Sequence, residues 1–338
     1  MITVLFLVKI GIVFLLSMGL NYLLVKYQRI INIFDIPNAR SVHLHVKPRS
    51  GGIAIFSACL MGFYLCDLQI SYLFIVPLSL VFVVGLCDDI WSVSSKRKLI
   101  ITALAAISLY FLGFDIQHFG TFFGHEVILN VWFSVFIVAF GIAGFVSALN
   151  LIDGLDGLAS LVSVMILLPF AYMGFKYTDP FLFYFSSIVL CAIFGFLMLN
   201  WHPAKLFMGD SGSMMLGFTI SIVVVYAIQK DYITAISVLL LCAVPILDTL
   251  IVILRRVLHH QHPFHADKTH IHHIILKQQF DDTRKTVLLI GLMQMLFSYL
   301  GLGFKVRDDI VILGLYILCF ILFYFILTPD TQRKDDAQ

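Results

Sequence analysis

The sequence predicts an all-α, polytopic integral membrane protein in which residues 1–338 form a single multi-pass domain. Of the 338 residues, 60% are hydrophobic and only 12% are charged. Apolar runs long enough to cross a bilayer recur from one end of the chain to the other. A soluble globule of this composition would leave much apolar surface in water, so we exclude that class.

Eleven apolar windows, separated by charged clusters or by Gly and Pro, are candidate transmembrane helices. The first window lacks the basic start and the small-residue cleavage site of a signal peptide, so we expect it to remain as a span. The window at 214–228 is the shortest of the set. The windows cover residues 2–25, 51–66, 70–87, 99–114, 131–149, 157–175, 180–200, 214–228, 232–254, 286–304 and 309–328.

The distribution of basic residues predicts how these spans are oriented. Apart from Lys9, which lies within the first window, alternate loops divide the Lys and Arg residues into a set of seventeen and a set of four, and the richer set marks the cytoplasmic side. We therefore expect the N-terminus outside and the C-terminus in the cytoplasm. The six cysteines lie singly in apolar segments, so no disulfide framework is predicted. The expected cytoplasmic active-site loops cover residues 26–50, 88–98, 150–156, 201–213 and 255–285.

The unusual polar clusters all lie on this cytoplasmic side, which predicts a single site there. Asn150, Asp153 and Asp156 recur every third residue in NLIDGLDGL and would share one face of a helix. Gly154 and Gly157 flank the aspartates and leave room for a polar ligand to approach the backbone closely. A helix N-cap with one additional aspartate is the simpler alternative.

Three further aspartates are candidates for the same site. Adjacent carboxylates at Asp88 and Asp89 favour a bound cation, and Lys98 lies nearby, although a solvated helix terminus is the alternative. Asp210 lies in FMGDSGS, where a Gly-rich backbone can donate N–H groups to phosphate and where a turn cap is the alternative.

A second group of candidates follows in the chain. Asp248 lies deeper in its window, where a carboxylate indicates function or, as an equal alternative, a structural pair with Arg255. Seven of the twelve histidines lie between residues 259 and 273. Alone, this cluster would indicate a metal site, but the basic residues on both sides of it favour an anion.

Carboxylates, a basic His-rich loop and glycine turns together fit Mg²⁺-assisted phosphoryl transfer, in which the protein positions groups and neutralises charge. The membrane location predicts that one substrate is a lipid. A His-rich metal transporter would need polar residues at several depths, and an intramembrane aspartyl protease would need two facing aspartates within the membrane. Because the polar residues gather at one side, both alternatives are disfavoured.

Five motifs resemble those of the polyprenyl-phosphate N-acetylhexosamine-1-phosphate transferases (glycosyltransferase family 4) in order and spacing: LCDDI, NLIDGLDGL, FMGDSGSMMLG, PILDTLIVILRR and DKTHIHH. The likeness is greatest to the undecaprenyl-phosphate α-N-acetylglucosaminyl 1-phosphate transferase branch. It implies transfer of GlcNAc-1-phosphate from UDP-GlcNAc to undecaprenyl phosphate with release of UMP. Such a reaction initiates a cell-envelope polysaccharide, for example the O-antigen of lipopolysaccharide.

The resemblance also implies roles for individual residues. It assigns Mg²⁺, or Mn²⁺ in its place, to Asp210 and Asp89, and it leaves open which of Asp88 and Asp89 acts as base or as ligand. Asp156 would lie near the uracil, and the histidines would clamp the sugar nucleotide. The catalytic residues would be Asp88, Asp89 and Asp210, and the substrate-binding residues Asn150, Asp153, Asp156, Lys98, Arg49, His270, His272 and His273.

Two departures from the family pattern and a set of partners complete the expectation. Ser41 stands where this branch commonly has Lys, so another UDP-N-acetylhexosamine is the alternative donor. His259, His260 and His262 have no counterpart and leave room for a metal or pH effect. The expected partners are a UDP-N-acetylhexosamine, undecaprenyl phosphate and the lipid bilayer of the bacterial inner membrane, with a homodimer left open and no nucleic acid.

Overall fold

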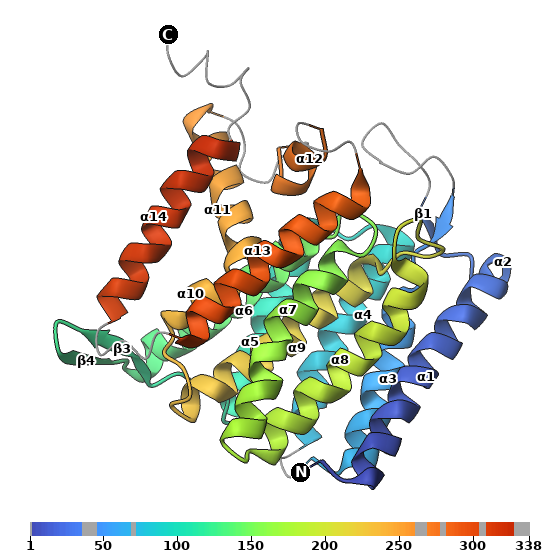
Figure 1. Ribbon diagram of the computed structural model, residues 1–338, viewed down its shortest axis with the longest axis horizontal. Coiled ribbons are helices and arrows are strands. Elements are labelled where there is room, and N and C mark those ends of the chain that lie inside the picture. The colour runs from blue at the N-terminus through green and yellow to red at the C-terminus, as the bar shows by residue number, and fades with distance from the viewer. Residues whose placement is uncertain are drawn as a thin grey trace.

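In the computed structural model of the chain, long helices stand side by side and successive long helices run in opposite directions (Figure 1). The structure describes residues 2–35, 46–68, 72–260, 269–277, 282–303 and 309–327. The helices are α1 (Val4–Lys26), α2 (Gln28–Ile31), α3 (Gly51–Cys66), α4 (Ile75–Trp91), α5 (Ser95–Phe111), α6 (Val131–Ile152), α7 (Leu158–Lys176), α8 (Pro180–Asn200), α9 (Gly209–Gln229), α10 (Ser237–Leu241), α11 (Ala243–Leu258), α12 (Ile271–Ile275), α13 (Thr283–Gly303) and α14 (Asp309–Leu327), with a short 3₁₀ helix at Tyr72–Phe74.

Each of the eleven apolar windows falls on a helix, and the window 232–254 falls on two, α10 and α11, which are interrupted at Cys242. Among the described residues, seven helices are long and apolar enough to cross a membrane, namely α1, α6, α7, α8, α9, α13 and α14. The helices α3, α4 and α5 have 16, 17 and 17 residues. The chain is therefore a multi-pass membrane protein, and the number of eleven crossings stays a prediction.

Two small sheets are additions to the predicted helical fold. The strands β1 (Phe34–Asp35) and β2 (Lys47–Pro48) pair antiparallel beside the start of α3. The strands β3 (His118–Phe122) and β4 (His125–Ile128) form a hairpin between α5 and α6. Phe123 and Gly124 in its turn have φ values of 51° and 78°, and this left-handed pair is the geometry of a type I′ turn.

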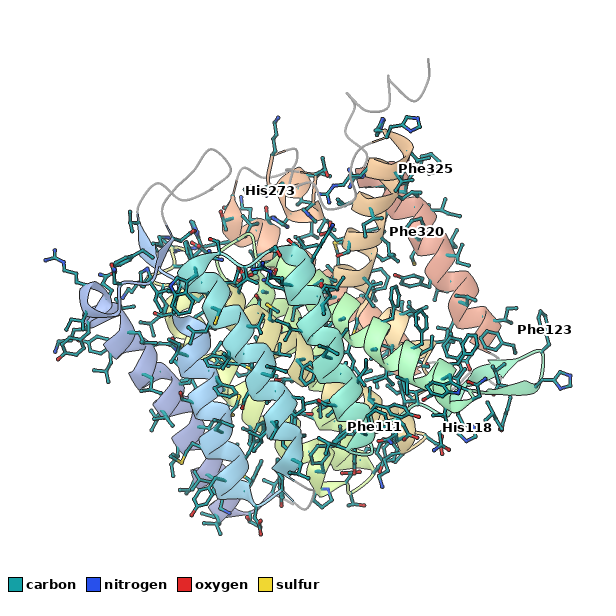
Figure 2. All side chains as sticks on the ribbon, turned by 180° about the vertical axis from the view of Figure 1, so that it is seen from behind. Phe111, His118, Phe123, His273, Phe320 and Phe325 are labelled. Carbon is teal, nitrogen blue, oxygen red and sulfur yellow. The ribbon has the colours of Figure 1, made fainter. Side chains whose placement is uncertain are left out.

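The outer surface of the bundle is apolar, as contact with lipid requires. Only 17% of the apolar window of α14 and 22% of that of α1 are buried within the protein. Phe111, Phe123 and Phe325 are among the large exposed side chains, and they lie at the outside of the bundle (Figure 2). A soluble protein would not expose apolar surface of this extent, so the surface supports a location within a bilayer.

The helix α9 is the centre of the bundle, although the sequence made it the shortest window. It contacts α3, α4, α6, α7 and α8, and 94% of its apolar window is buried. Glycines allow this close approach, because a Cβ on Gly85 would lie 2.5 Å from the carbonyl oxygen of Asp210, and one on Gly52 would lie 2.3 Å from the backbone nitrogen of Gly212. The helices α3 and α4 are thereby held against the first turn of α9.

The bundle has two ends, which we name from α9. The proximal end is where α9 begins at Gly209, and it also carries the sheet β1–β2 and α12; the distal end is where α9 ends at Gln229, and it carries the hairpin β3–β4 (Figure 1). The helix α1 starts at the distal end and α14 finishes at the proximal end. The start of α1 and the end of α14 therefore lie at opposite ends of the bundle, while their orientation across a membrane stays a prediction.

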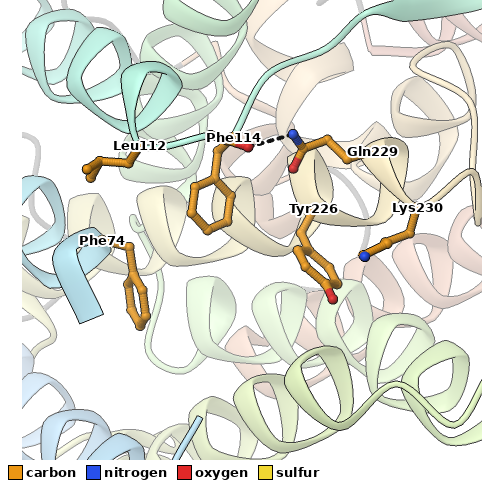
Figure 3. A pocket seen from close by; sticks show the side chains of 7 residues that line it. Phe74, Leu112, Phe114, Tyr226, Gln229 and Lys230 are labelled. Atoms are coloured by element: carbon orange, nitrogen blue, oxygen red, sulfur yellow. Dashed lines mark hydrogen bonds between the residues drawn. The ribbon is translucent and has the colours of Figure 1, made fainter. Parts of the chain in front are cut away.

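The distal end is held together by a buried carboxylate and uncharged donors. Asp179 caps α8 by accepting the N–H of Leu182 at 3.0 Å, and its second oxygen accepts the hydroxyl groups of Tyr226 at 3.0 Å and Tyr232 at 3.1 Å. Tyr226 also lines a cavity of about 420 Å³ at this end of the bundle (Figure 3). The cavity is lined by Phe74, Leu112, Gly113, Phe114, Tyr226, Gln229 and Lys230.

Candidate active site

Asp210 lies in the first turn of α9, and Asp89 at the end of α4 fixes its position. The two carboxylate oxygens of Asp89 accept the backbone N–H groups of Asp210 at 2.8 Å and Ser211 at 3.0 Å. A carboxylate at the N-terminus of a helix satisfies its free N–H groups and complements its dipole. Gly209 makes the contact sterically feasible, because its φ is +74° and a Cβ there would lie 2.6 Å from Asp89.

Two cations converge on the carboxylate of Asp210 from separate segments. Arg49, which follows β2, places Nη2 at 2.9 Å from Oδ1 of Asp210. Lys98, in the first turn of α5, contacts the other oxygen of Asp210 and lies 3.1 Å from Oδ2 of Asp88. We call Asp88, Asp89, Asp210, Arg49 and Lys98 the charged cluster. The structure thus brings together all three predicted catalytic aspartates and two predicted substrate-binding residues.

The segment from Asp153 to Gly157 is a turn between α6 and α7, so the expectation that three polar residues share one helix face is wrong. The helix α6 ends at Ile152. Gly157 has a φ of +79°, a left-handed conformation that glycine adopts readily, and its N–H donates to Asn200 Oδ1 at 3.0 Å. Asn150 alone remains on α6, where its amide donates to Ser213 Oγ of α9 at 2.8 Å.

Asp153 lies in this turn, and its carboxylate interacts electrostatically with the charged cluster. Burial raises the pKa of Asp153 to about 7; Arg49 opposes this increase, while the carboxylates of Asp210 and Asp89 add to it. The side chain therefore changes its protonation state near neutral pH, unlike an ordinary aspartate.

Asp156, at the other end of the turn, belongs to a different set of contacts. Its Oδ2 lies 2.8 Å from Nδ1 of His202 and accepts the N–H of Ala204 at 2.9 Å. Lys47 places its ammonium 3.9 Å from the same oxygen and 5.0 Å from the centre of the Phe207 ring. Sequence reasoning did not assign Lys47 or Phe207 to the site, although Lys47 lies two residues before Arg49 and Phe207 three before Asp210.

The predicted histidines lie at the proximal end, where Figure 2 shows His273. His270 Nδ1 lies 2.7 Å from Asp248 Oδ2, so Asp248 has a histidine partner in place of the alternative pair with Arg255. The His272 ring is tilted by 44° from that of His273, with 4.2 Å between the ring centroids. A Cβ on Gly154 would lie only 2.2 Å from His272 Nε2, which places this histidine against the α6–α7 turn.

The remaining predictions concern the extra histidines and the residue that differs from the family pattern. His259 and His260 follow the end of α11, and His260 has a left-handed φ of 54°. Ser41 and His262 lie outside the described residues. Across the residues that are described, no group of three or more His, Cys, Asp or Glu side chains is arranged to hold a metal ion.

The charged cluster nevertheless fits the expected Mg²⁺. Asp88 and Asp210 both direct a carboxylate oxygen at the ammonium of Lys98, so they already converge on one positive charge. Carboxylate oxygens are the hard ligands that Mg²⁺ prefers, and it needs only one or two of them when substrate phosphates and water complete its coordination. The oxygens of Asp89, in contrast, are engaged with backbone N–H groups.

Known proteins are similar to this chain over most of its length. The sequence profile of glycosyl transferase family 4 matches residues 71–228. A protein of Bacillus subtilis (strain 168), named "Probable undecaprenyl-phosphate N-acetylglucosaminyl 1-phosphate transferase", is 34% identical over 301 residues, which cover 87% of this chain and 83% of the relative. Two proteins named undecaprenyl-phosphate alpha-N-acetylglucosaminyl 1-phosphate transferase are also similar. The one of Yersinia pestis is 28% identical with 92% and 88% coverage, and the one of Escherichia coli (strain K12) is 27% identical with 88% and 84% coverage.

The helical bundle and its charged cluster, together with these similarities, define the class as multi-pass membrane transferases. Within that class, the chain belongs to glycosyl transferase family 4.

Proposed function

We propose that the protein transfers an N-acetylhexosamine 1-phosphate from a UDP-sugar to undecaprenyl phosphate, with GlcNAc-1-phosphate as the first candidate. The products would be undecaprenyl-diphospho-sugar and UMP. The observation that carries the proposal is the charged cluster, in which carboxylates and cations from four segments meet at one end of a membrane bundle. The names of relatives that match more than four-fifths of the chain support it.

The chemistry requires one bond to form and one to break. An oxygen of the lipid phosphate attacks the sugar-bearing phosphorus of the donor, and the bond from that phosphorus to the oxygen bridging to UMP breaks, so that UMP leaves with this oxygen. The second pKa of a phosphate monoester is about 6, so most of the acceptor is already the attacking dianion at pH 7. The protein therefore has to position the two phosphates and neutralise their charge.

The residues of the charged cluster divide this work in our proposal. Arg49 and Lys98 exchange part of their contact with Asp210 for donor and acceptor phosphate oxygens. Asp210 and Asp88 would hold Mg²⁺, with Mn²⁺ as the alternative, and the ion when bound would neutralise charge on the diphosphate. Asp89, which sequence analysis assigned to the metal, orients Asp210 through the backbone of α9.

The donor would extend from the charged cluster across the α6–α7 turn. Asp156, Lys47 and the Phe207 ring offer a carboxylate, a cation and an aromatic face, a combination that suits the uracil end of the nucleotide. Asp153 and His272 lie on the turn between this patch and the charged cluster, where the diphosphate and the sugar would bind. All these residues come from one chain, so the proposal does not require a homodimer.

We further propose eleven membrane crossings in the bacterial inner membrane, with the proximal end in the cytoplasm. The alternating direction of successive long helices and the concentration of Lys and Arg in proximal loops support this orientation. It would give the site access to cytoplasmic UDP-sugars and to a lipid phosphate in the inner leaflet, in keeping with the initiation of a cell-envelope polysaccharide.

The test is a transfer assay with purified protein in detergent, undecaprenyl phosphate and a panel of UDP-N-acetylhexosamines. We expect release of UMP and formation of a sugar diphospholipid, both dependent on the acceptor and abolished by EDTA. The donor with the highest kcat/KM identifies the sugar. Release of UMP at the same rate without acceptor, or no transfer from any donor, would contradict the proposed function.

A further inference from the structure

Asp248 is buried in α11, outside the charged cluster, and both of its oxygens contact the histidine segment. Oδ2 lies 2.7 Å from Nδ1 of His270, and Oδ1 accepts the backbone N–H of Ile271 at 2.7 Å. One carboxylate therefore fixes a ring and the adjacent backbone at the point where α12 begins. His270 is itself buried, so its ring has little freedom to leave this contact.

A second contact from the same helix holds the segment just before His270. Arg255 Nη2 donates to the carbonyl oxygen of Thr269 at 2.8 Å. Asp248 and Arg255 are seven residues apart, which is about two helical turns and places them on one face of α11. This face of α11 thus binds the backbone on both sides of His270.

The residue held in place by these contacts is His272. It is 1% exposed, and within the described part of the chain neither ring nitrogen has a hydrogen-bond partner. Its Nε2 faces Gly154, beside Asp153 and the α6–α7 turn. A buried polar group without a partner destabilises the fold unless a ligand supplies the missing hydrogen bond. The two unpaired nitrogens therefore indicate a ligand position.

We propose that Asp248 is a positioning residue that acts through His270 and Ile271 to hold His272 against Gly154, where its ring nitrogens bind oxygens of the nucleotide sugar. The inference rests on the proposed function and divides the roles of the predicted histidine clamp. His270 serves as a support whose Nδ1 is already engaged, and His272 contacts the donor.

The environment of His272 narrows the kind of oxygen it binds. Burial, with a smaller contribution from the neighbouring His273, lowers the pKa of His272 to about 3, so the imidazole is neutral at physiological pH. A neutral imidazole has one N–H donor and one acceptor nitrogen. A sugar hydroxyl can accept from the first or donate to the second, whereas a phosphate oxygen can only accept. The donor's sugar hydroxyls are therefore the preferred partner.

The first test uses Asp248→Asn. The amide can still accept the N–H of Ile271 but no longer pairs with His270 as an anion, so the segment shifts. We expect kcat/KM for the UDP-sugar to fall by about 10–100-fold, the size of effect seen when a residue that orients a metal-binding histidine is replaced. The KM for undecaprenyl phosphate should stay within about twofold. The matched control is Asp179→Asn, a buried aspartate with polar partners at the distal end, which should leave both constants unchanged.

A double variant separates positioning from general destabilisation. If Asp248 acts through His272, adding Asp248→Asn to His272→Ala should cause little further loss of kcat/KM. Donor binding provides a readout without turnover, because the UDP-sugar should raise Tm of the wild type and raise it much less in Asp248→Asn. Losses that multiply in the double variant, or KM values that rise equally for both substrates, would overturn the proposal.

Gly154→Ala tests the same contact from the opposite side. Gly154 has no left-handed φ that would strain an alanine, but the new Cβ would lie 2.2 Å from His272 Nε2 and would displace the ring. We expect the same selective loss of donor binding, while Gly144→Ala on α6, with open space around the new Cβ, should behave as wild type. Normal donor kinetics in Gly154→Ala would refute the inference even if Asp248→Asn failed to fold. Absence of transfer by the wild type would instead remove the proposed function, and the donor-induced Tm shift would still report on Asp248.

Discussion

Asp210 at the proximal end and Asp179 at the distal end occupy similar places on their helices, but different groups contact their carboxylates. Each lies at the start of a long helix and each is 8% exposed. Asp179 accepts hydrogen bonds from a backbone N–H and two tyrosine hydroxyls, all uncharged. Asp210 faces Arg49 and Lys98, while another carboxylate binds its backbone N–H.

The difference shows that burial alone does not separate a structural carboxylate from a catalytic one. The donors around Asp179 are a backbone N–H and two tyrosine hydroxyls, which carry no charge that an anionic ligand could attract. These hydrogen bonds are therefore expected to stay in place. Arg and Lys can exchange a carboxylate for a phosphate with similar charge and geometry. The partners of Asp210 are therefore suited to a site that takes up and releases a charged ligand.

The largest expected effect is that of Asp210→Asn on turnover. The change removes one negative charge from the charged cluster, and an electrostatic loss of about 3–4 kcal/mol corresponds to a decrease in kcat of about 10²–10³-fold. The variant should still insert and fold. Asp179→Asn is the matched control and should keep wild-type kcat. Near-normal turnover of Asp210→Asn at saturating Mg²⁺ would show that Asp210 is not catalytic, and the proposed contrast with the structural Asp179 would no longer hold.

Only the distal end should be accessible to a reagent added outside the cell. Lys205 and Lys230 are exposed lysines at the proximal and distal ends. We expect a membrane-impermeant maleimide added to intact cells to label Lys230→Cys and to label Lys205→Cys only after lysis, with the wild type giving the background of the six native cysteines. Labelling of both positions from one side would break the proposed topology.

Loss of the distal carboxylate should appear in stability and not in catalysis. Asp179→Asn weakens the acceptor of two tyrosine hydroxyls, which costs about 1–3 kcal/mol when buried donors lose their partner. We therefore expect a lower Tm by thermal denaturation in detergent with unchanged KM values. An unchanged Tm would mean that Asp179 is not the structural counterpart of Asp210.

The smallest effect concerns pH and Asp153. Its folded-state pKa of about 7 exceeds the value of about 4 of an unfolded aspartate, so stability from this group is present at low pH and is lost as pH rises from about 4 to 7. Asp153→Asn removes this dependence. At pH 8 its Tm should exceed that of the wild type by about 2–4 °C, and the difference should shrink as pH falls toward 5. A constant difference across pH would contradict the increased pKa.

The sequence predicted where the site lies better than how its residues are arranged. Charge counting and motif positions both led to one end of the bundle, because a bilayer forces charge to its surfaces whatever the tertiary contacts. The helix face through Asp153 and Asp156 was wrong, although Gly154 and Gly157 were visible signals of a turn. The three-residue spacing of the polar side chains favours a helix, whereas the two glycines favour the turn that the structure contains.

Other features depend on contacts that no local pattern contains. The pairing of Asp248 with His270 joins α11 to the residue that precedes α12, 22 positions further along the chain, and Arg255 was the nearer candidate in sequence. The hairpin β3–β4 is short and mostly exposed, so its alternation was too weak to predict. The sequence did not predict that α9 lies at the centre of the bundle. Its Gly and Ser residues permit close packing, but they also lower its mean hydropathy, so its apolar window looked short.

The burial of α9 has a consequence for how such an enzyme diverges between lineages. Side chains on α14 face outward and can be exchanged as membrane thickness or lipid composition changes, since few protein neighbours constrain them. The helix that carries Asp210 has neighbours on every side, so a substitution there disturbs several helices at once. Adaptation to a new bilayer should therefore accumulate at the periphery, while the positions around Gly52, Gly85 and Gly212 drift slowly.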